Sequence, residues 1–344
     1  MKTKLIFLMA LIGISIGATA QHVDASKDPN IDPAIRPFLK ELNEAGKNTT
    51  PLWLLPGKGP SEGLTGLQNK TQVDLSGVDI TQRTITQDGV EVPIYILRPS
   101  GTQEVLPVIM FFHGGVWIAG SFENHKRLVR DLVVNTHSVG VFVDYTFIRE
   151  AKFPTQINQA YAATKWVSEH GSEIKADGSR IALAGNSVGG NMAAAVALMA
   201  RDKGAPAIRF QALLYPALDA NFETGSYKAF ADERFLSRAF MQYGWSMYAP
   251  DAATRKERYA APLQATLEQL KGVAPALIQT AENDPLRDEG EAYGKKLSEA
   301  GVECTTVRYN SMIHDFQLLN AINHLPAVQV SLRQLYTELK LHLQ

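Results

Sequence analysis

The sequence predicts an α/β fold with a mostly parallel central sheet, helices on both of its faces and a helical cap. Short apolar segments of strand length alternate with amphipathic segments of helical length along most of the 344 residues. All-apolar strands are typical of parallel sheets that are covered on both faces. Residues 216–261 interrupt this alternation, because they hold many aromatic side chains but no convincing strand. Helices that lie over one end of a sheet give this pattern, and so does ordinary helix packing; the two interpretations are compatible.

The expected elements follow one another in a regular order. Ile35, Phe38, Leu39 and Leu42 recur at helical spacing, which predicts one short helix near the start of the chain. Two strands at 80–86 and 90–97 flank Gln87-Asp88-Gly89, a sequence typical of a β-hairpin. Further strands are expected at 108–112, 139–145, 181–184, 210–215, 276–280 and 304–309. Helices are expected around 124–136, 155–170, 188–203, 286–300 and 326–343.

The first 20 residues have the pattern of a signal peptide. Lys2 and Lys4 precede an apolar run from Leu5 to about Gly17, which ends in Ala18-Thr19-Ala20. A basic start, an apolar run and an A-x-A site predict export with cleavage after Ala20. We therefore expect a secreted or periplasmic protein with no stable membrane span after cleavage. The alternative is that the run remains as an uncleaved membrane anchor.

Composition excludes several classes of partner and scaffold. The formal net charge is -1 and charged residues make up 20% of the chain, so nothing indicates a nucleic-acid partner. Cys304 is the single cysteine, which excludes an internal disulfide framework.

The strongest functional motif is Gly185-Asn186-Ser187-Val188-Gly189. It follows the apolar run 181–184 and precedes an alanine-rich stretch, 190–200, with strong helix propensity. A G-x-S-x-G sequence between a strand and a helix forms a sharp turn that exposes the serine hydroxyl at the edge of a sheet. Ser187 is therefore the predicted nucleophile.

A serine nucleophile needs a base, and the base needs an acid to orient it. Of the histidines that follow Ser187, His314 is the one that comes directly after an expected strand, whereas His324 and His342 fall in the C-terminal helical region. The acid should lie at the end of the preceding strand, where Glu282, Asp284 and Asp288 compete. We favour Asp284, because Pro285 keeps it in a loop before the helix begins.

Backbone N–H groups must also stabilise the negative charge that develops on the substrate oxygen. His113-Gly114-Gly115-Val116 follows the expected strand 108–112, as in the HGGG-type motif of lipases and esterases. Gly114, Gly115 and Val116, together with Val188, are the candidate donors of this oxyanion hole. A β-branched residue resists a positive φ, so we expect an ordinary backbone conformation at Val116.

Taken together, these motifs resemble the hormone-sensitive-lipase-like family of α/β-hydrolases, which includes the bacterial family IV esterases. The resemblance extends from about residue 75 to the C-terminus. It rests on His113-Gly114-Gly115, Asp144-Tyr145, the serine motif with Gly190, Asp284-Pro285-Leu286-Arg287-Asp288-Glu289-Gly290 and His314-Asp315-Phe316. It implies an α/β-hydrolase catalytic domain at 76–344. It also implies a cap built from residues 21–75 and an insertion at about 216–261.

The chain departs from the family pattern at several positions around the expected site. Val116 stands where the family has its third glycine, Asn186 where it has aspartate, Val188 where it has alanine and Ser311 where it has glycine. Residues 145–150 also differ from the usual sequence. No departure removes a group of the expected triad, so we expect them to affect the substrate and not the class of reaction.

The resemblance implies a serine carboxylesterase that acts on short- to medium-chain acyl esters, with no cofactor and no metal ion. A small-amide hydrolase on the same triad is one alternative. A ligand-binding protein on a hydrolase fold is another, although such homologues have lost the catalytic histidine and this chain has His314. The sequence leaves the natural ester and the oligomeric state open.

Overall fold

The computed structural model of the chain describes residues 24–344. The expected signal peptide, residues 1–20, and its cleavage site lie outside the described residues. Between residues 24 and 344, no helix is both long enough and apolar enough to cross a membrane.

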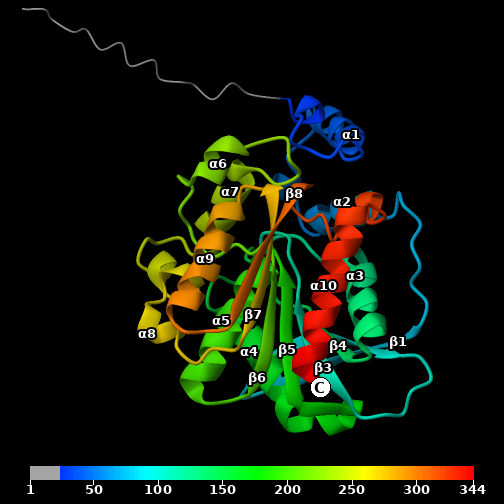
Figure 1. Cartoon of the computed structure of the whole chain (residues 1–344), viewed down its shortest axis with the longest axis vertical. Coiled ribbons are helices and arrows are strands. Elements are labelled where there is room, and N and C mark those ends of the chain that lie inside the picture. Colours follow the sequence, from blue (N-terminus) through cyan, green and yellow to red (C-terminus); the bar gives the residue numbers. More distant parts are fainter. Residues whose placement is uncertain (1–23) are drawn as a thin grey trace, which may run out of the picture.

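An eight-stranded sheet forms the centre of the molecule, in the order β1-β2-β4-β3-β5-β6-β7-β8 (Figure 1). The strand pairs β1–β2 and β2–β4 are antiparallel, and all the other pairs are parallel. The predicted mostly parallel sheet is therefore confirmed. The strands are β1 (Val78–Gln87), β2 (Val90–Pro99), β3 (Leu106–Phe112), β4 (Val139–Val143), β5 (Ala176–Asn186), β6 (Ile208–Leu214), β7 (Ala276–Asn283) and β8 (Cys304–Ile313).

Helices cover both faces of this sheet, as predicted. Helices α3 and α10 pack on one face, and α4, α5 and α9 pack on the other (Figure 1). The α-helices are α1 (Arg36–Gly46), α2 (Gly59–Gln68), α3 (Phe122–Thr136), α4 (Thr155–His170), α5 (Val188–Lys203), α6 (Gly225–Ala229), α7 (Arg238–Tyr248), α8 (Leu267–Leu270), α9 (Arg287–Glu299) and α10 (Pro326–Leu343). Short 3-10 turns lie at Ala25–Lys27, Leu52–Leu54, Gly171–Ile174, Thr254–Lys256, Pro262–Gln264 and Asn320–Ile322.

Alternation of side chains along each central strand explains why two layers of helices are needed. In β3, Val108, Met110 and Phe112 point into the core beneath α4 and α5. Ile109 and Phe111 point into the core beneath α3 and α10. All five are completely buried, so both faces of the strand need a cover to remove this apolar surface from water.

Several elements differ from the sequence expectations; β5, for example, spans Ala176–Asn186 where 181–184 was expected. Strands β7 and β8 run further than predicted, to Asn283 and Ile313, because polar residues continue the backbone pairing after the apolar runs end. Helix α2 (Gly59–Gln68) was not predicted, since its glycines and Pro60 are poor helix formers. Contacts with the rest of the chain stabilise it: Gln68 donates to the carbonyls of Asn124 and Leu318 at 2.9 and 2.8 Å.

Two segments far apart in the sequence meet above the carboxyl ends of the strands. Residues 24–69 contain α1 and α2, and residues 216–261 contain α6 and α7; these helices gather at one end of the sheet (Figure 1). A buried ion pair of 2.6 Å joins Asp28 in the first segment to Arg234 in the second. Both segments therefore lie over the sheet edge from which the candidate side chains emerge.

Candidate active site

Every candidate side chain lies in a loop that begins where a strand ends. His113 follows β3, Ser187 follows β5, Asp284 follows β7 and His314 follows β8. Parallel strands present their carboxyl ends at one edge of the sheet, which is where ligands bind in open α/β folds. The topology thus brings together four positions that span about 200 residues of sequence (Figure 1).

Ser187 occupies a strained turn between β5 and α5. Its backbone has φ 56° and ψ -123°, a conformation that non-glycine residues seldom adopt. The turn is held by hydrogen bonds from Ser187 N–H to the Leu214 carbonyl, 2.9 Å, and from Ala217 N–H to the Ser187 carbonyl, 3.1 Å. Gly189 is required because a Cβ there would collide with the Phe112 carbonyl. The sequence therefore forms the predicted serine turn.

Hydrogen bonds join Ser187, His314 and Asp284 in a line. The Nε2 atom of His314 lies 3.1 Å from the Ser187 Oγ, and its Nδ1 atom lies 2.7 Å from Asp284 Oδ2. The other Asp284 oxygen accepts the N–H of Leu286 at 2.8 Å, which fixes the carboxylate. With Nδ1–H donating to Asp284, Nε2 is free to accept the proton of the serine hydroxyl.

The two neighbouring carboxylates determine the proton affinity of His314. Burial alone would lower the pKa of this imidazole, which is 1% exposed. Asp284 and Asp315 more than offset the burial, so the pKa of His314 lies above its ordinary value of 6.5. The base is therefore stabilised in the protonated form that it adopts after it has accepted a proton.

The competing acids of the sequence analysis have other partners. Glu282 accepts the N–H of Ser311 at 2.7 Å and so ties the end of β7 to β8. Asp288 accepts the N–H of Ser226 at 2.7 Å.

Among the other histidines, His342 stacks on Phe210 with ring centroids 4.2 Å apart. Of the candidates, Asp284 and His314 are the pair that meets Ser187.

The loop of residues 113–120, here called the β3 loop, lies beside Ser187. Gly114 N–H donates to the side-chain oxygen of Asn186 at 2.9 Å, so this amide does not face the site as we expected. Within the described residues, the N–H groups of Gly115 and Val116 have no acceptor. Val188 provides the first amide of α5, and the first amides of a helix have no partner inside it. Three candidate oxyanion donors thus remain available.

The expectation of an ordinary conformation at Val116 is wrong. Val116 and Trp117 both have φ 56°, in the left-handed region. Packing against the cap holds them there: the Val116 side chain lies against Gly244 of α7, and the Trp117 ring stacks on Tyr248 of α7 with centroids 3.9 Å apart. Tertiary contacts therefore override the local preference of a β-branched residue.

His113, at the start of the β3 loop, stabilises this loop through its hydrogen bonds and ring contacts, and its imidazole is neutral. Its carbonyl accepts the Tyr145 hydroxyl at 2.9 Å, and its ring stacks on that of Tyr145 with centroids 4.1 Å apart. Burial lowers the pKa of His113 to about 4, so near neutral pH its Nδ1–H can donate to the Gly114 carbonyl, 2.7 Å away.

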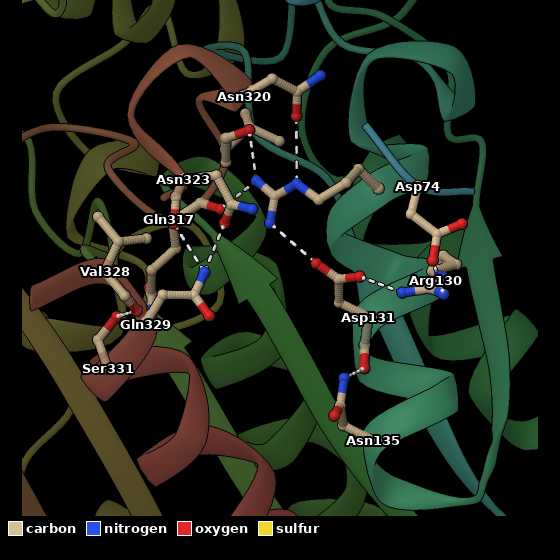
Figure 2. Close-up of polar contacts among 12 residues, drawn as sticks. Asp74, Arg130, Asp131, Asn135, Gln317, Asn320, Asn323, Val328, Gln329 and Ser331 are labelled. Atoms are coloured by element: carbon tan, nitrogen blue, oxygen red, sulfur yellow. Dashed lines mark hydrogen bonds and ion pairs between the residues drawn. The ribbon is translucent and has the colours of Figure 1, made fainter. Parts of the chain in front are cut away.

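A buried arginine fixes the loop of residues 314–319, here called the β8 loop. The Arg127 guanidinium, on α3, donates to the carbonyls of Gln317 and Leu318 and to the Asn320 side chain. In Figure 2, Asn320 and Asp131 contact this guanidinium from opposite sides. Asp131 lies 3.2 Å from Arg127 and supplies the compensating charge. Nothing in the α3 sequence distinguished Arg127 from a surface residue.

Comparisons with known proteins agree with this geometry. A family model described as the alpha/beta hydrolase fold matches residues 109–318. This chain belongs to the α/β-hydrolase family. An esterase from Pseudomonas putida, described as thermostable, superposes with a TM-score of 0.89 at 54% sequence identity, over 92% of this chain and 99% of that one. The predicted resemblance to the hormone-sensitive-lipase-like esterases is thereby confirmed.

Two further relatives of this α/β-hydrolase are named for ester hydrolysis. The carboxylesterase NlhH of Mycobacterium tuberculosis is 34% identical over 295 residues, which cover 84% of this chain and 89% of the relative. An ethyl acetate hydrolase of Pseudomonas putida is 30% identical over 240 residues, which cover 69% of this chain and 75% of the relative.

Proposed function

We propose that this α/β-hydrolase is a serine carboxylesterase that hydrolyses short- to medium-chain acyl esters. The observation that carries the proposal is the hydrogen-bonded line from Ser187 through His314 to Asp284. A nucleophile, a base and an orienting acid in this geometry are the requirements for acyl transfer through a covalent intermediate.

The reaction follows from the positions of these three groups. The Ser187 Oγ attacks the ester carbonyl while His314 Nε2 accepts its proton. His314 then returns the proton to the alcohol oxygen, so the C–O bond breaks and an acyl-enzyme forms. Water, activated by the same base, attacks the acyl carbon and releases the carboxylic acid. Asp284 holds the imidazole in the required tautomer and stabilises its protonated form throughout.

The amides of Gly115, Val116 and Val188 are the proposed donors to the oxygen of the tetrahedral intermediate. Backbone donors that are fixed in advance need no reorganisation when negative charge develops on that oxygen. Gly114 holds the β3 loop through its bond to Asn186 and does not donate to the intermediate. Each amide that reaches the oxyanion contributes about 3–4 kcal/mol to transition-state stabilisation.

Two observations favour ester hydrolysis over amide hydrolysis and over a ligand-binding role. The relatives named above are called a carboxylesterase and an ethyl acetate hydrolase, and no observation favours an amide. A ligand-binding role is disfavoured because His314 is present and bonded to both of its partners. The signal-peptide pattern of residues 1–20, with cleavage after Ala20, supports a secreted or periplasmic enzyme.

Hydrolysis of p-nitrophenyl acetate and butyrate tests this function. We expect Ser187→Ala to abolish turnover while the melting temperature stays within about 2 °C of the wild type, because the change removes one hydroxyl. Ser298→Ala, at an exposed position on α9, serves as the control and should retain full activity. Turnover by Ser187→Ala equal to that of the wild type would exclude the mechanism.

An acyl-chain series tests the proposed substrate range. Val188 is fully buried next to the nucleophile, and Val116 is 2% exposed in the β3 loop. If these side chains narrow the acyl pocket, kcat/KM falls steeply beyond butyrate. Equal values for butyrate and octanoate would contradict a narrow pocket but leave the reaction class intact.

A further inference from the structure

Asn186 makes two hydrogen bonds in opposite senses. Its side-chain oxygen accepts the Gly114 N–H at 2.9 Å. Its side-chain nitrogen donates to Asp315 Oδ1, also at 2.9 Å. Gly114 belongs to the β3 loop and Asp315 to the β8 loop, so one completely buried amide joins both loops to the serine turn.

Asp315 is placed to act on the proposed base. Its Oδ2 atom lies 3.9 Å from His314 Nε2, and its backbone is left-handed with φ 59°. Burial raises the pKa of the Asp315 carboxyl, and the neighbouring His314 and Asn186 partly counteract that increase. A donor such as Asn186 thus favours the charged form of a carboxyl that burial alone would neutralise.

Only an amide satisfies both neighbours at this position. An ionised aspartate could accept from Gly114, but it would place a second carboxylate about 3 Å from Asp315, and two such groups cannot both be ionised without a large energetic cost. An apolar side chain would leave the Gly114 N–H without its acceptor and Asp315 Oδ1 without its amide donor. Asn186, which stands where the family has aspartate, therefore matches the donor of Gly114 and the acceptor of Asp315.

We propose that Asn186 is a positioning residue that keeps Asp315 ionised beside His314 and fixes the β3 loop at the same time. Asp315 then acts as a second counter-charge for the imidazolium, in addition to Asp284. The inference rests on the proposed ester hydrolysis, whose own test is the turnover of the wild type and of Ser187→Ala.

Among the other titratable groups around Asp315, His314 and, more weakly, the Tyr215 hydroxyl also favour its charged form. His125, from α3, is buried and its pKa lies well below the ordinary value, so it carries no charge near neutral pH. Burial raises the pKa of Tyr215, at the end of β6, well above its ordinary value, so it is neutral too. Arg127 is engaged by the carbonyls of the β8 loop and by Asp131. Asp284 accepts from His314 and Leu286.

The pH dependence of Asn186→Asp separates this role from a structural one. At low pH a protonated aspartic acid can donate to Asp315 and accept from Gly114, as the amide does. At higher pH the proton shared by the two carboxyl groups is lost, and the hydrogen bond between residue 186 and Asp315 breaks. We expect the ratio of variant to wild-type kcat/KM to fall at least about tenfold between about pH 6 and about pH 9. A ratio that is independent of pH would overturn the proposal.

Gln211→Glu is the matched control for a carboxyl placed in the same sheet. Gln211 is completely buried in β6, and its amide donates to the Ala274 carbonyl at the opposite end of the strand from the site. We expect this change to lower the melting temperature but to leave the activity ratio constant with pH. Asn186→Leu should lose about tenfold or more of kcat/KM at every pH, and wild-type activity in that variant would also overturn the proposal.

Asp315→Asn tests whether Asp315 is a counter-charge for His314, even if Asn186→Asp does not fold. This variant keeps an acceptor for Asn186 and removes the charge next to His314. The acid limb of the kcat/KM profile should move to lower pH by about half a unit or more, because His314 loses one of its stabilising carboxylates. An unchanged acid limb would show that Asp315 is not a counter-charge for the base.

Discussion

The side chain of Val116 lies against Gly244, so the β3 loop and the cap helix α7 are in direct contact beside the active serine turn. A Cβ on Gly244 would collide with Val116 Cγ1. Trp117, the next residue, stacks on Tyr248 of the same helix. The cap therefore does more than cover the site, because it also holds two left-handed residues in the loop that supplies the proposed oxyanion donors.

Gly244→Ala tests this contact. The added methyl group should displace Val116 and lower kcat about tenfold or more, because small misplacements of catalytic groups have large effects on rate. Val116→Gly in the same chain restores the space, so the double variant should recover most of the lost kcat. Gly66→Ala is the control, since this helical glycine of α2 has nothing within 4 Å of its would-be Cβ. A double variant no more active than Gly244→Ala would contradict the account.

Asp284→Asn and Asp288→Asn form a matched pair. Asp284 contacts His314, whereas Asp288 accepts from Ser226 and pairs with Arg287. We expect Asp284→Asn to lower kcat by about four orders of magnitude, because the wrong histidine tautomer is then favoured. Asp288→Asn should retain kcat within about threefold. Comparable losses in both variants would show that the acid has been assigned wrongly.

The pH profile of the wild type should have an acid limb above pH 6.5. His314 accepts a proton only in its neutral form, and the neighbouring carboxylates raise its pKa above that ordinary value. As the pH falls through this pKa, kcat/KM should fall about tenfold per unit. The measurement is steady-state hydrolysis across the pH range at constant ionic strength. A midpoint below 6.5 would mean that burial outweighs Asp284 and Asp315.

Glu289 should make the stability of the fold depend on pH. Burial raises the pKa of Glu289 well above its ordinary value of 4.5, so the folded state retains a proton that the unfolded state releases. The native state therefore loses stability as the pH rises above about 4.5, and the loss ends when the pH passes the pKa of Glu289 in the folded form. Glu289→Gln removes this loss, so its melting temperature relative to the wild type should increase with pH. A difference that stays constant from acid to neutral pH would contradict the raised pKa.

Much of the fold could be predicted from the sequence because the local and global preferences agree. The apolar run 108–112 lies within strand β3, and the helices 155–170, 188–203 and 326–343 have the predicted bounds. In the hairpin, Asp88 and Gly89 have φ 50° and 77°, as the turn sequence predicts. Helix α2 was missed because contacts of Gln68, and not helix propensity, stabilise it.

The candidate site also has residues that the sequence predicts and features that depend on contacts distant in the chain. Ser187, Asp284 and His314 could be named because each follows an expected strand. Turn glycines also mark Ser187, and Pro285 marks Asp284. The positive φ of Val116 could not be predicted, since it depends on a contact with Gly244 some 130 positions away in the chain. The role of Gly114 also depends on a distant partner, Asn186.

Reaction with a fluorophosphonate, followed by mass spectrometry, tests the central claim most directly. The phosphorus atom is attacked by a serine only when a base activates the hydroxyl and donors stabilise the resulting charge. The account predicts one adduct per chain, located on Ser187, and no adduct in Ser187→Ala. A wild-type chain that does not react, or an adduct that persists in Ser187→Ala, would contradict the proposal that this chain is a serine esterase.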